Sequence, residues 1–194
     1  YRRQLANALI NADQPQRALE VLRDLVGFRP DDAAAWYTLS GLEFQQRNPG
    51  EAERAVRRVI ELEPEGLRGP YLLTQILAAQ SRYQELTEVL GPIIERAALS
   101  NVDPNQVASL LQRLGAAHEQ LGAHDAAIRA LSSARDLSPS DLGVQAQLAQ
   151  TYIEAQRFDE AGEVVEQAKL QRPDNLMLSR LEAMTLSAQG EVGD

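Results

Sequence analysis

The sequence has 194 residues, a formal net charge of −9 and no cysteine. Its negative field repels nucleic acid and anionic membrane surfaces, and the missing thiol excludes disulfides, thiolate metal sites and a cysteine nucleophile. Hydrophobic residues make up 44% but aromatic residues only 5%, while Ala, Leu, Glu, Gln and Arg recur throughout. That composition favours helices and almost no strand.

No segment approaches the roughly 20 apolar residues of a membrane span, and no basic start followed by an apolar run indicates a signal peptide. The chain begins with Tyr1 rather than Met. We therefore expect a soluble fragment of a longer chain that has lost its original N-terminus and any targeting signal. The compartment, cytoplasm or periplasm, stays open.

Three stretches of the chain share one pattern. Residues 35–64, 110–139 and 144–173 align without gaps, each with small or apolar residues near its start and a proline at its end. Small residues let two paired helices approach closely, and proline ends a helix because it lacks an N–H. The anchors of the predicted second helices are Ala52, Val56, Val59 and Pro64; Ala127, Leu131, Ala134 and Pro139; and Ala161, Val165, Ala168 and Pro173.

These residues resemble the tetratricopeptide repeat, whose 34-residue pattern W-x2-L-G-x2-Y…A-x3-F…P describes two antiparallel helices. The resemblance implies an all-α fold, a right-handed superhelical α-solenoid of stacked antiparallel helix pairs, with about five tetratricopeptide repeats plus one extra terminal helix. In that frame the chain, 1–194, is a single tetratricopeptide repeat domain. Its predicted parts are a partial repeat 1–32, repeats 33–66 and 67–100, an insertion 101–107, repeats 108–141 and 142–175, and a partial repeat 176–194.

The third predicted repeat departs most from the pattern. Gly69-Pro70 should delay its first helix, and Pro92 should kink or interrupt its second helix because proline removes a helical hydrogen bond. Residues 101–107 are additional to the period, and Asp103 within them predicts an N-cap for the next helix. This insertion is either a tolerated loop or a functional joint.

No group of residues indicates catalysis. His118 and His124 are further apart than the four-residue spacing that places two ligands on one helix face, and both occupy aromatic slots of the repeat pattern. We interpret them as packing residues. Acidic pairs such as Glu61 with Glu63 are typical of solvated helix surface, and no glycine loop resembles a phosphate cradle. We therefore expect no enzyme activity, no cofactor and no metal.

The resemblance implies that first helices line a concave groove. Their inward positions carry amides, which can hydrogen-bond a peptide backbone, and tyrosines, which offer a flat apolar ring with a polar end. Three aromatic rings cluster in the second and third repeats, so we expect the best binding patch in the N-terminal half. The alternative is that some of these rings only fill space between helices. The predicted partner-binding residues are Arg3, Asn7, Tyr37, Phe44, Gln45, Tyr71, Gln75, Gln112, Glu119 and Gln150.

Some members of the family grip a terminal carboxylate with a clamp of cations and amides. The corresponding positions are Arg3, Asn7, Thr38, Arg68 and Leu72. Thr38 lacks the amide and Leu72 removes the last donor, so the sequence disfavours such a clamp.

The resulting hypothesis is a non-catalytic protein–protein interaction scaffold that binds a partner protein or peptide in the concave groove. The partner would be neutral to basic if the negative field extends over that surface. Two alternatives remain: a substrate-positioning repeat region of a larger enzyme, such as a glycosyltransferase or peptidase, or a structural scaffold in envelope assembly or polysaccharide export. We also expect an end-to-end homodimer, because Leu178, Leu181, Met184 and Leu186 lack a covering second helix.

Overall fold

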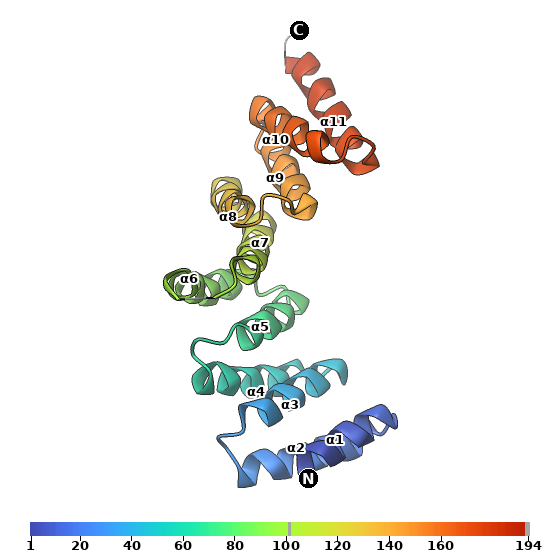
Figure 1. Ribbon diagram of the computed structural model, residues 1–194, viewed down its shortest axis with the longest axis vertical. Coiled ribbons are helices and arrows are strands. Elements are labelled where there is room, and N and C mark those ends of the chain that lie inside the picture. Colours follow the sequence, from blue (N-terminus) through green and yellow to red (C-terminus); the bar gives the residue numbers. More distant parts are fainter. Residues whose placement is uncertain (101, 193–194) are drawn as a thin grey trace. The chain divides into compact units, whose positions relative to one another are not determined.

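The computed structural model describes residues 1–100 and 102–192, and within them the chain is all-α, with helices and no strands. Asn101 of the predicted insertion and residues 193–194 of the predicted last repeat lie outside the described residues. The helices are α1 (Arg2–Asn11), α2 (Pro15–Phe28), α3 (Ala33–Gln45), α4 (Pro49–Leu62), α5 (Arg68–Ala79), α6 (Tyr83–Leu99), α7 (Pro104–Gln120), α8 (His124–Leu137), α9 (Leu142–Glu154), α10 (Phe158–Gln171) and α11 (Leu176–Val192) (Figure 1).

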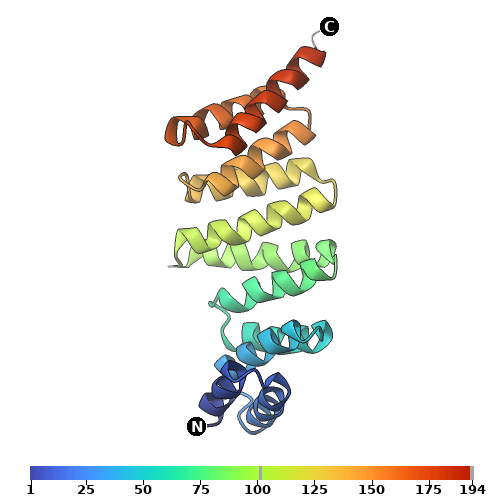
Figure 2. The same cartoon turned by 90° about the vertical axis from the view of Figure 1, so that its right-hand side faces the viewer.

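The chain divides into two compact units, Tyr1–Arg82 and Tyr83–Asp194, called here the N-terminal and C-terminal units. Within each unit, helices that follow one another in sequence pack as antiparallel neighbours (Figure 2). Alternate helices also touch, because α3 contacts α5 and α9 contacts α11. In each unit, two helices that each open a helix pair therefore lie side by side: α3 with α5, and α9 with α11.

The turns that join the paired helices have one conformation. In each, a residue with positive φ follows the first helix: Asp13, Arg47, Ser81, Gly122 and Gln156. The next backbone N–H donates to a carbonyl five residues earlier, as in Asn48 to Glu43 and Ala123 to His118, which is the Schellman arrangement that ends a helix. Only Gly122 adopts this backbone without the steric cost of a Cβ atom.

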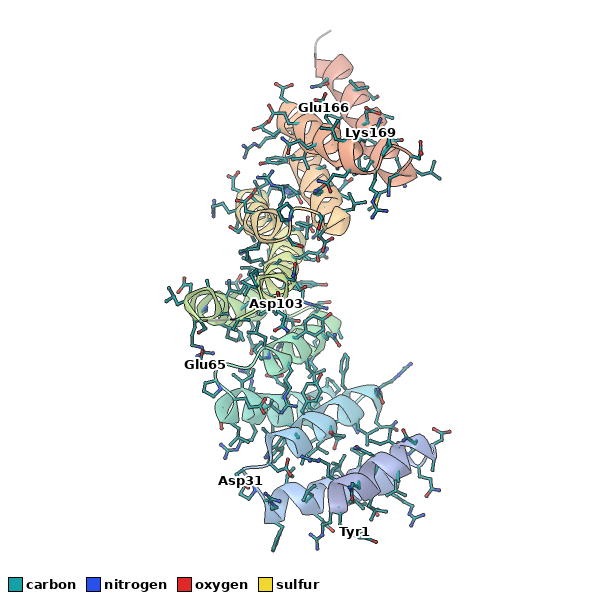
Figure 3. The ribbon with its side chains drawn as sticks, in the orientation of Figure 1. Tyr1, Asp31, Glu65, Asp103, Glu166 and Lys169 are labelled. Carbon is teal, nitrogen blue, oxygen red and sulfur yellow. The ribbon has the colours of Figure 1, made fainter. Side chains whose placement is uncertain are left out.

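Side-chain caps start most of the first helices. Asp32, Asp103, Asp141 and Asn175 each accept a hydrogen bond from a backbone N–H of the helix that follows (Asp103 is labelled in Figure 3). The predicted N-cap at Asp103 is confirmed, with Pro104 as the first residue of α7. These caps satisfy N–H groups that have no partner within the helix.

Small residues hold paired helices close together, as the sequence pattern predicts. Ser40 of α3 donates from Oγ to the carbonyl of Ala52 on α4 at 2.8 Å, and both residues are fully buried. Gly115 of α7 faces α8, where a Cβ atom would come within 2.6 Å of Leu131 Cγ. Ala127 and Ala161 have no exposed surface.

The structure corrects two expectations for the third predicted repeat. α5 starts at Arg68, so Gly69 and Pro70 lie inside its first turn, where both are buried. A Cβ atom at Gly69 would lie 2.9 Å from Ile60 Cγ1, so glycine permits the close contact with α4. The predicted interruption of α6 does not occur, since the helix continues through the exposed Pro92 with buried side chains on both sides of it. A kink at Pro92 stays a prediction.

A third correction concerns α11. Leu178 and Leu181 are buried rather than uncovered, because α11 packs against α9 and α10. Lys169 of α10 donates from Nζ to Glu182 Oε2 of α11 at 2.5 Å, and this bond also joins α10 to α11. Among the described side chains of α11, the large apolar residues Leu176, Met177 and Leu186 are exposed.

Candidate functional site

The first helices of the C-terminal unit, α7, α9 and α11, border a hollow of about 550 Å³. Its walls combine carboxylates, amides, one guanidinium and two thioethers. The lining residues are Glu119, Gly143, Ala146, Gln147, Gln150, Glu154, Met177, Arg180, Leu181 and Met184. A mixed polar and apolar lining of this kind offers both hydrogen-bonding groups and apolar contact area.

The carboxylate of Glu119 is held in a defined position by α9. Gln147 donates from Nε2 to Glu119 Oε2 at 2.9 Å, and the hydroxyl of Thr151 donates to Glu119 Oε1. Thr151 is fully buried, and its Oγ1 also lies 2.8 Å from the carbonyl oxygen of Gln147, so the single hydroxyl proton is shared between these two acceptors. The Glu119 carboxylate is therefore pre-organised at the wall of the hollow.

A second carboxylate lies on α9. Gln150 donates from Nε2 to Glu154 Oε1 at 3.0 Å, a pair one helical turn apart. Gln112 of α7 lies beside this region, because a Cβ atom at Gly143 would be 3.7 Å from its Nε2. The structure thus brings the predicted residues Glu119 and Gln150 together in one hollow, with Gln112 beside it.

The wall from α11 was missed by the sequence reasoning, which treated this helix as an incomplete repeat. Met177, Arg180, Leu181 and Met184 face the hollow. Their spacing of three, four and seven residues is typical of one helix face, and this signal could have identified them. Methionine side chains adapt their shape to an irregular ligand, which makes this wall a suitable apolar contact.

The predicted residues of the N-terminal unit lie on α1, α3 and α5. Arg3 pairs with Asp32 at 3.4 Å and lines a separate hollow of about 790 Å³ that also includes Phe28 and Asp31. The other six are on the three helices: Asn7 on α1; Tyr37, Phe44 and Gln45 on α3; Tyr71 and Gln75 on α5. Asn7, Gln45 and Tyr71 are exposed, and Tyr37, Phe44 and Gln75 are half-buried.

Tyr37 is covered on one face by Arg68. The guanidinium carbon of Arg68 lies 5.1 Å from the centre of the Tyr37 ring, within range of a cation–π interaction. The same guanidinium donates to both carboxylate oxygens of Glu63 at 2.7 and 2.6 Å. Arg68 therefore serves an internal contact, and Tyr37 presents its ring beside an ion pair.

Four of the five positions that correspond to a carboxylate clamp are paired or buried within the chain, and Asn7 is exposed. Besides Arg3 and Arg68, Thr38 donates from Oγ1 to the carbonyl of Ala34 at 3.0 Å, and Leu72 is buried.

The two histidines lie at the turn between α7 and α8. Burial lowers the pKa of His118, and the nearby Arg129 guanidinium lowers it further. Nδ1 of His124 is buried and has no hydrogen-bond partner among the described residues. Within the described residues, no group of three or more acidic or histidine side chains could hold a metal ion.

The paired helices, their shared turn and the surface of first helices define a helical-hairpin repeat protein. Two family models, each described as a tetratricopeptide repeat, match residues 3–66 and 119–184, which together span most of the sequence. The chain belongs to the tetratricopeptide repeat family.

Solved structures share this fold along nearly the whole chain. MamA residues 41 to the end from Desulfovibrio magneticus RS-1 are similar with a TM-score of 0.71 and 18% identity over 90% of this chain and 95% of that chain. YrrB, titled a TPR protein with an unusual peptide-binding site, has a TM-score of 0.66 and 18% identity over 93% and 89% of the two chains. TTC0263, a TPR protein of Thermus thermophilus, has a TM-score of 0.59 and 23% identity over 94% and 96% of the two chains.

At these identities, the likeness shows the fold and not the partner. No curated protein matches the sequence. Among the helices that the structure describes, none is both long and apolar enough to cross a membrane.

Proposed function

We propose that the chain is a non-catalytic scaffold that binds a partner protein or peptide on the surface of its first helices. The observation that supports this proposal is the hollow between α7, α9 and α11, where pre-organised polar groups stand beside exposed methionine. Amides of Gln147 and Gln150 can bond to a peptide backbone, and Met177 and Met184 can cover an apolar side chain.

Membership of the tetratricopeptide repeat family agrees with a scaffold role, and the peptide-binding site named for YrrB is a precedent in the same fold. In the N-terminal unit, the surface of Tyr37, Phe44 and Tyr71 is a second region that we propose for partner contact. Tyr71 retains 39% of its surface and offers both a ring and a hydroxyl.

Site-specific photo-crosslinking in cells tests this function. A photoreactive amino acid at position 150 should capture a partner protein, while the same group at Glu163, an exposed residue of α10, should capture far less. Equal capture from both positions, or no capture from position 150, would contradict the proposal. Capture of a substrate of a catalytic domain in the same polypeptide would favour the substrate-positioning alternative instead.

A further inference from the structure

The net charge of the protein resides in one of its two units. The N-terminal unit contains eleven arginines and eleven acidic residues, so its formal charge is zero. The C-terminal unit contains eight Lys and Arg residues and seventeen acidic residues, so it carries all of the −9. Its field therefore attracts cationic partners and repels anionic ones.

The side chains that line the hollow of the C-terminal unit also carry a net negative charge. It presents the carboxylates of Glu119 and Glu154 against the single guanidinium of Arg180. Glu119 already accepts hydrogen bonds from Gln147 and Thr151, yet a carboxylate has about four acceptor sites and can bond to a further donor. Because neighbours already orient this carboxylate, less entropy is lost when a cationic side chain binds to it.

The hollow also has an apolar side. Met177 is 57% exposed, and Met184 is half-buried on the same face of α11. Two small residues of α9, Gly143 and Ala146, also line the hollow. The hollow therefore pairs an anionic wall with an adaptable apolar wall.

We infer that the hollow binds a basic peptide segment in which Lys or Arg contacts Glu119 and Glu154 and a neighbouring Leu, Ile or Met side chain lies against Met177 and Met184. This inference rests on the proposed function and adds the chemical class of the partner. The amides of Gln147 and Gln150 line the same hollow and can bond to the peptide backbone.

Selection from a randomised library of displayed twelve-residue peptides against the purified chain provides the probe. Recovered peptides should be enriched in Lys and Arg next to large aliphatic residues and depleted in Asp and Glu. Binding of a recovered peptide should weaken as salt rises, because the contacts are partly exposed ion pairs.

Matched variants distinguish direct contacts with the carboxylates of the hollow from the general negative field of the C-terminal unit. The double variant Glu119→Gln, Glu154→Gln should weaken binding of the recovered peptide about tenfold or more. The control Glu163→Gln, Glu166→Gln removes the same charge from exposed positions of α10 and should change binding less than about twofold. Glutamine at position 119 can still accept a hydrogen bond from Gln147 or Thr151, and an unchanged melting curve checks that the fold is intact.

Recovery of neutral or acidic peptides, recovery of none, or equal weakening by the two double variants would overturn the inference. If crosslinking from position 150 still captures a partner in these cases, the proposed scaffold function stands and only the basic class fails. If crosslinking also fails, both proposals are wrong.

Discussion

Gly115 of α7 lies against Leu131 of α8, and the distance leaves no room for a methyl group. A Cβ atom at position 115 would be 2.6 Å from Leu131 Cγ and 2.9 Å from Leu131 Cδ2. Leu131 has no exposed surface, so it cannot move aside into solvent. Close packing of this helix pair therefore depends on glycine.

We predict that Gly115→Ala lowers the free energy of unfolding by about 1–3 kcal/mol, because overpacking forces the helices apart. Urea denaturation monitored by circular dichroism measures the change. Gly162→Ala in α10 is the matched control, since its Cβ would make only an ordinary contact of 3.9 Å with Thr185. That control should be neutral or stabilising by about 0.5–1 kcal/mol, and an equal loss in both variants would refute the packing argument.

Glu43 occupies a slot where the repeat pattern favours tyrosine, and the residue is 1% exposed. Arg23 donates to Glu43 Oε1 from Nε at 3.2 Å and from a terminal nitrogen at 2.7 Å, and Asn48 donates to Oε2 at 3.0 Å. We expect Arg23→Ala to destabilise the chain by about 1–2 kcal/mol, because a buried carboxylate loses a charged partner.

The control for this loss is Arg54→Ala, which removes a guanidinium from an exposed ion pair with Glu51. Exposed pairs contribute about 0–1 kcal/mol, so this variant should have a smaller effect in the same thermal or urea denaturation. Adding Glu43→Leu to Arg23→Ala should recover part of the stability, since it removes the unpaired charge. A double variant less stable than Arg23→Ala alone would count against this account.

We predict that His118 makes the free energy of unfolding depend on pH. Burial and Arg129 lower its pKa in the folded chain below the ordinary 6.5. At pH values between the folded-state pKa and the ordinary pKa, the unfolded chain therefore binds more protons than the folded chain. The contribution of His118 to stability is complete above the ordinary pKa and decreases as pH falls through this window. His118→Gln should therefore show a smaller loss of stability than the unmodified chain between about pH 7.5 and 5.5. Equal losses for the two proteins in urea titrations at these pH values would contradict the prediction.

Tyr37→Ala combined with Tyr71→Ala should weaken binding of the captured partner while leaving helical content and melting nearly unchanged. Tyr37 contributes one cation–π contact with Arg68, worth about 0.5–1 kcal/mol at an exposed site, so a small loss of stability is expected. Phe28→Ala is the control, because Phe28 is an exposed aromatic ring on α2 that makes a similar cation–π contact. The guanidinium carbon of Arg2 lies 5.6 Å from the centre of this ring. If the double variant unfolds, the two rings are core and our assignment fails.

The exposed leucines of α11 lead us to predict self-association. Leu176 and Leu186 are 86% and 63% exposed, and burying them against a second copy would be favourable. Light scattering should show a mass that rises with concentration, and Leu176→Gln with Leu186→Gln should abolish the rise. A constant monomer mass for the unmodified chain would reject this dimer.

The fold was predictable because its pattern depends on contacts between neighbouring helices. Small residues such as Ser40 and Ala52, and the Asp103 cap, act within one hairpin or one helix end, so their spacing in sequence predicts their contacts. The same local rules predicted an interruption of α6 at Pro92, and this prediction was wrong. The helix is continuous because the packing of its buried neighbours outweighs the loss of one hydrogen bond.

The candidate site was predictable only in part. Glu119 and Gln150 were expected on an inward surface from the repeat frame, and they line one hollow. The α11 wall, with Met177, Arg180 and Met184, was not anticipated, because this helix was interpreted as an incomplete repeat although the spacing of these residues places them on one helix face. The binding of a partner at Tyr37 and Tyr71 stays a prediction.

The sequence by itself determined the all-α hairpin repeat, because that pattern follows from local helix propensity and from small residues at fixed spacing. Only the tertiary structure decided which polar groups remain available for a partner. Glu119 bonds to Thr151 and Arg68 stacks on Tyr37, in each case between helices that belong to successive hairpins. Such contacts depend on how one hairpin packs on the next, and no single repeat contains that information.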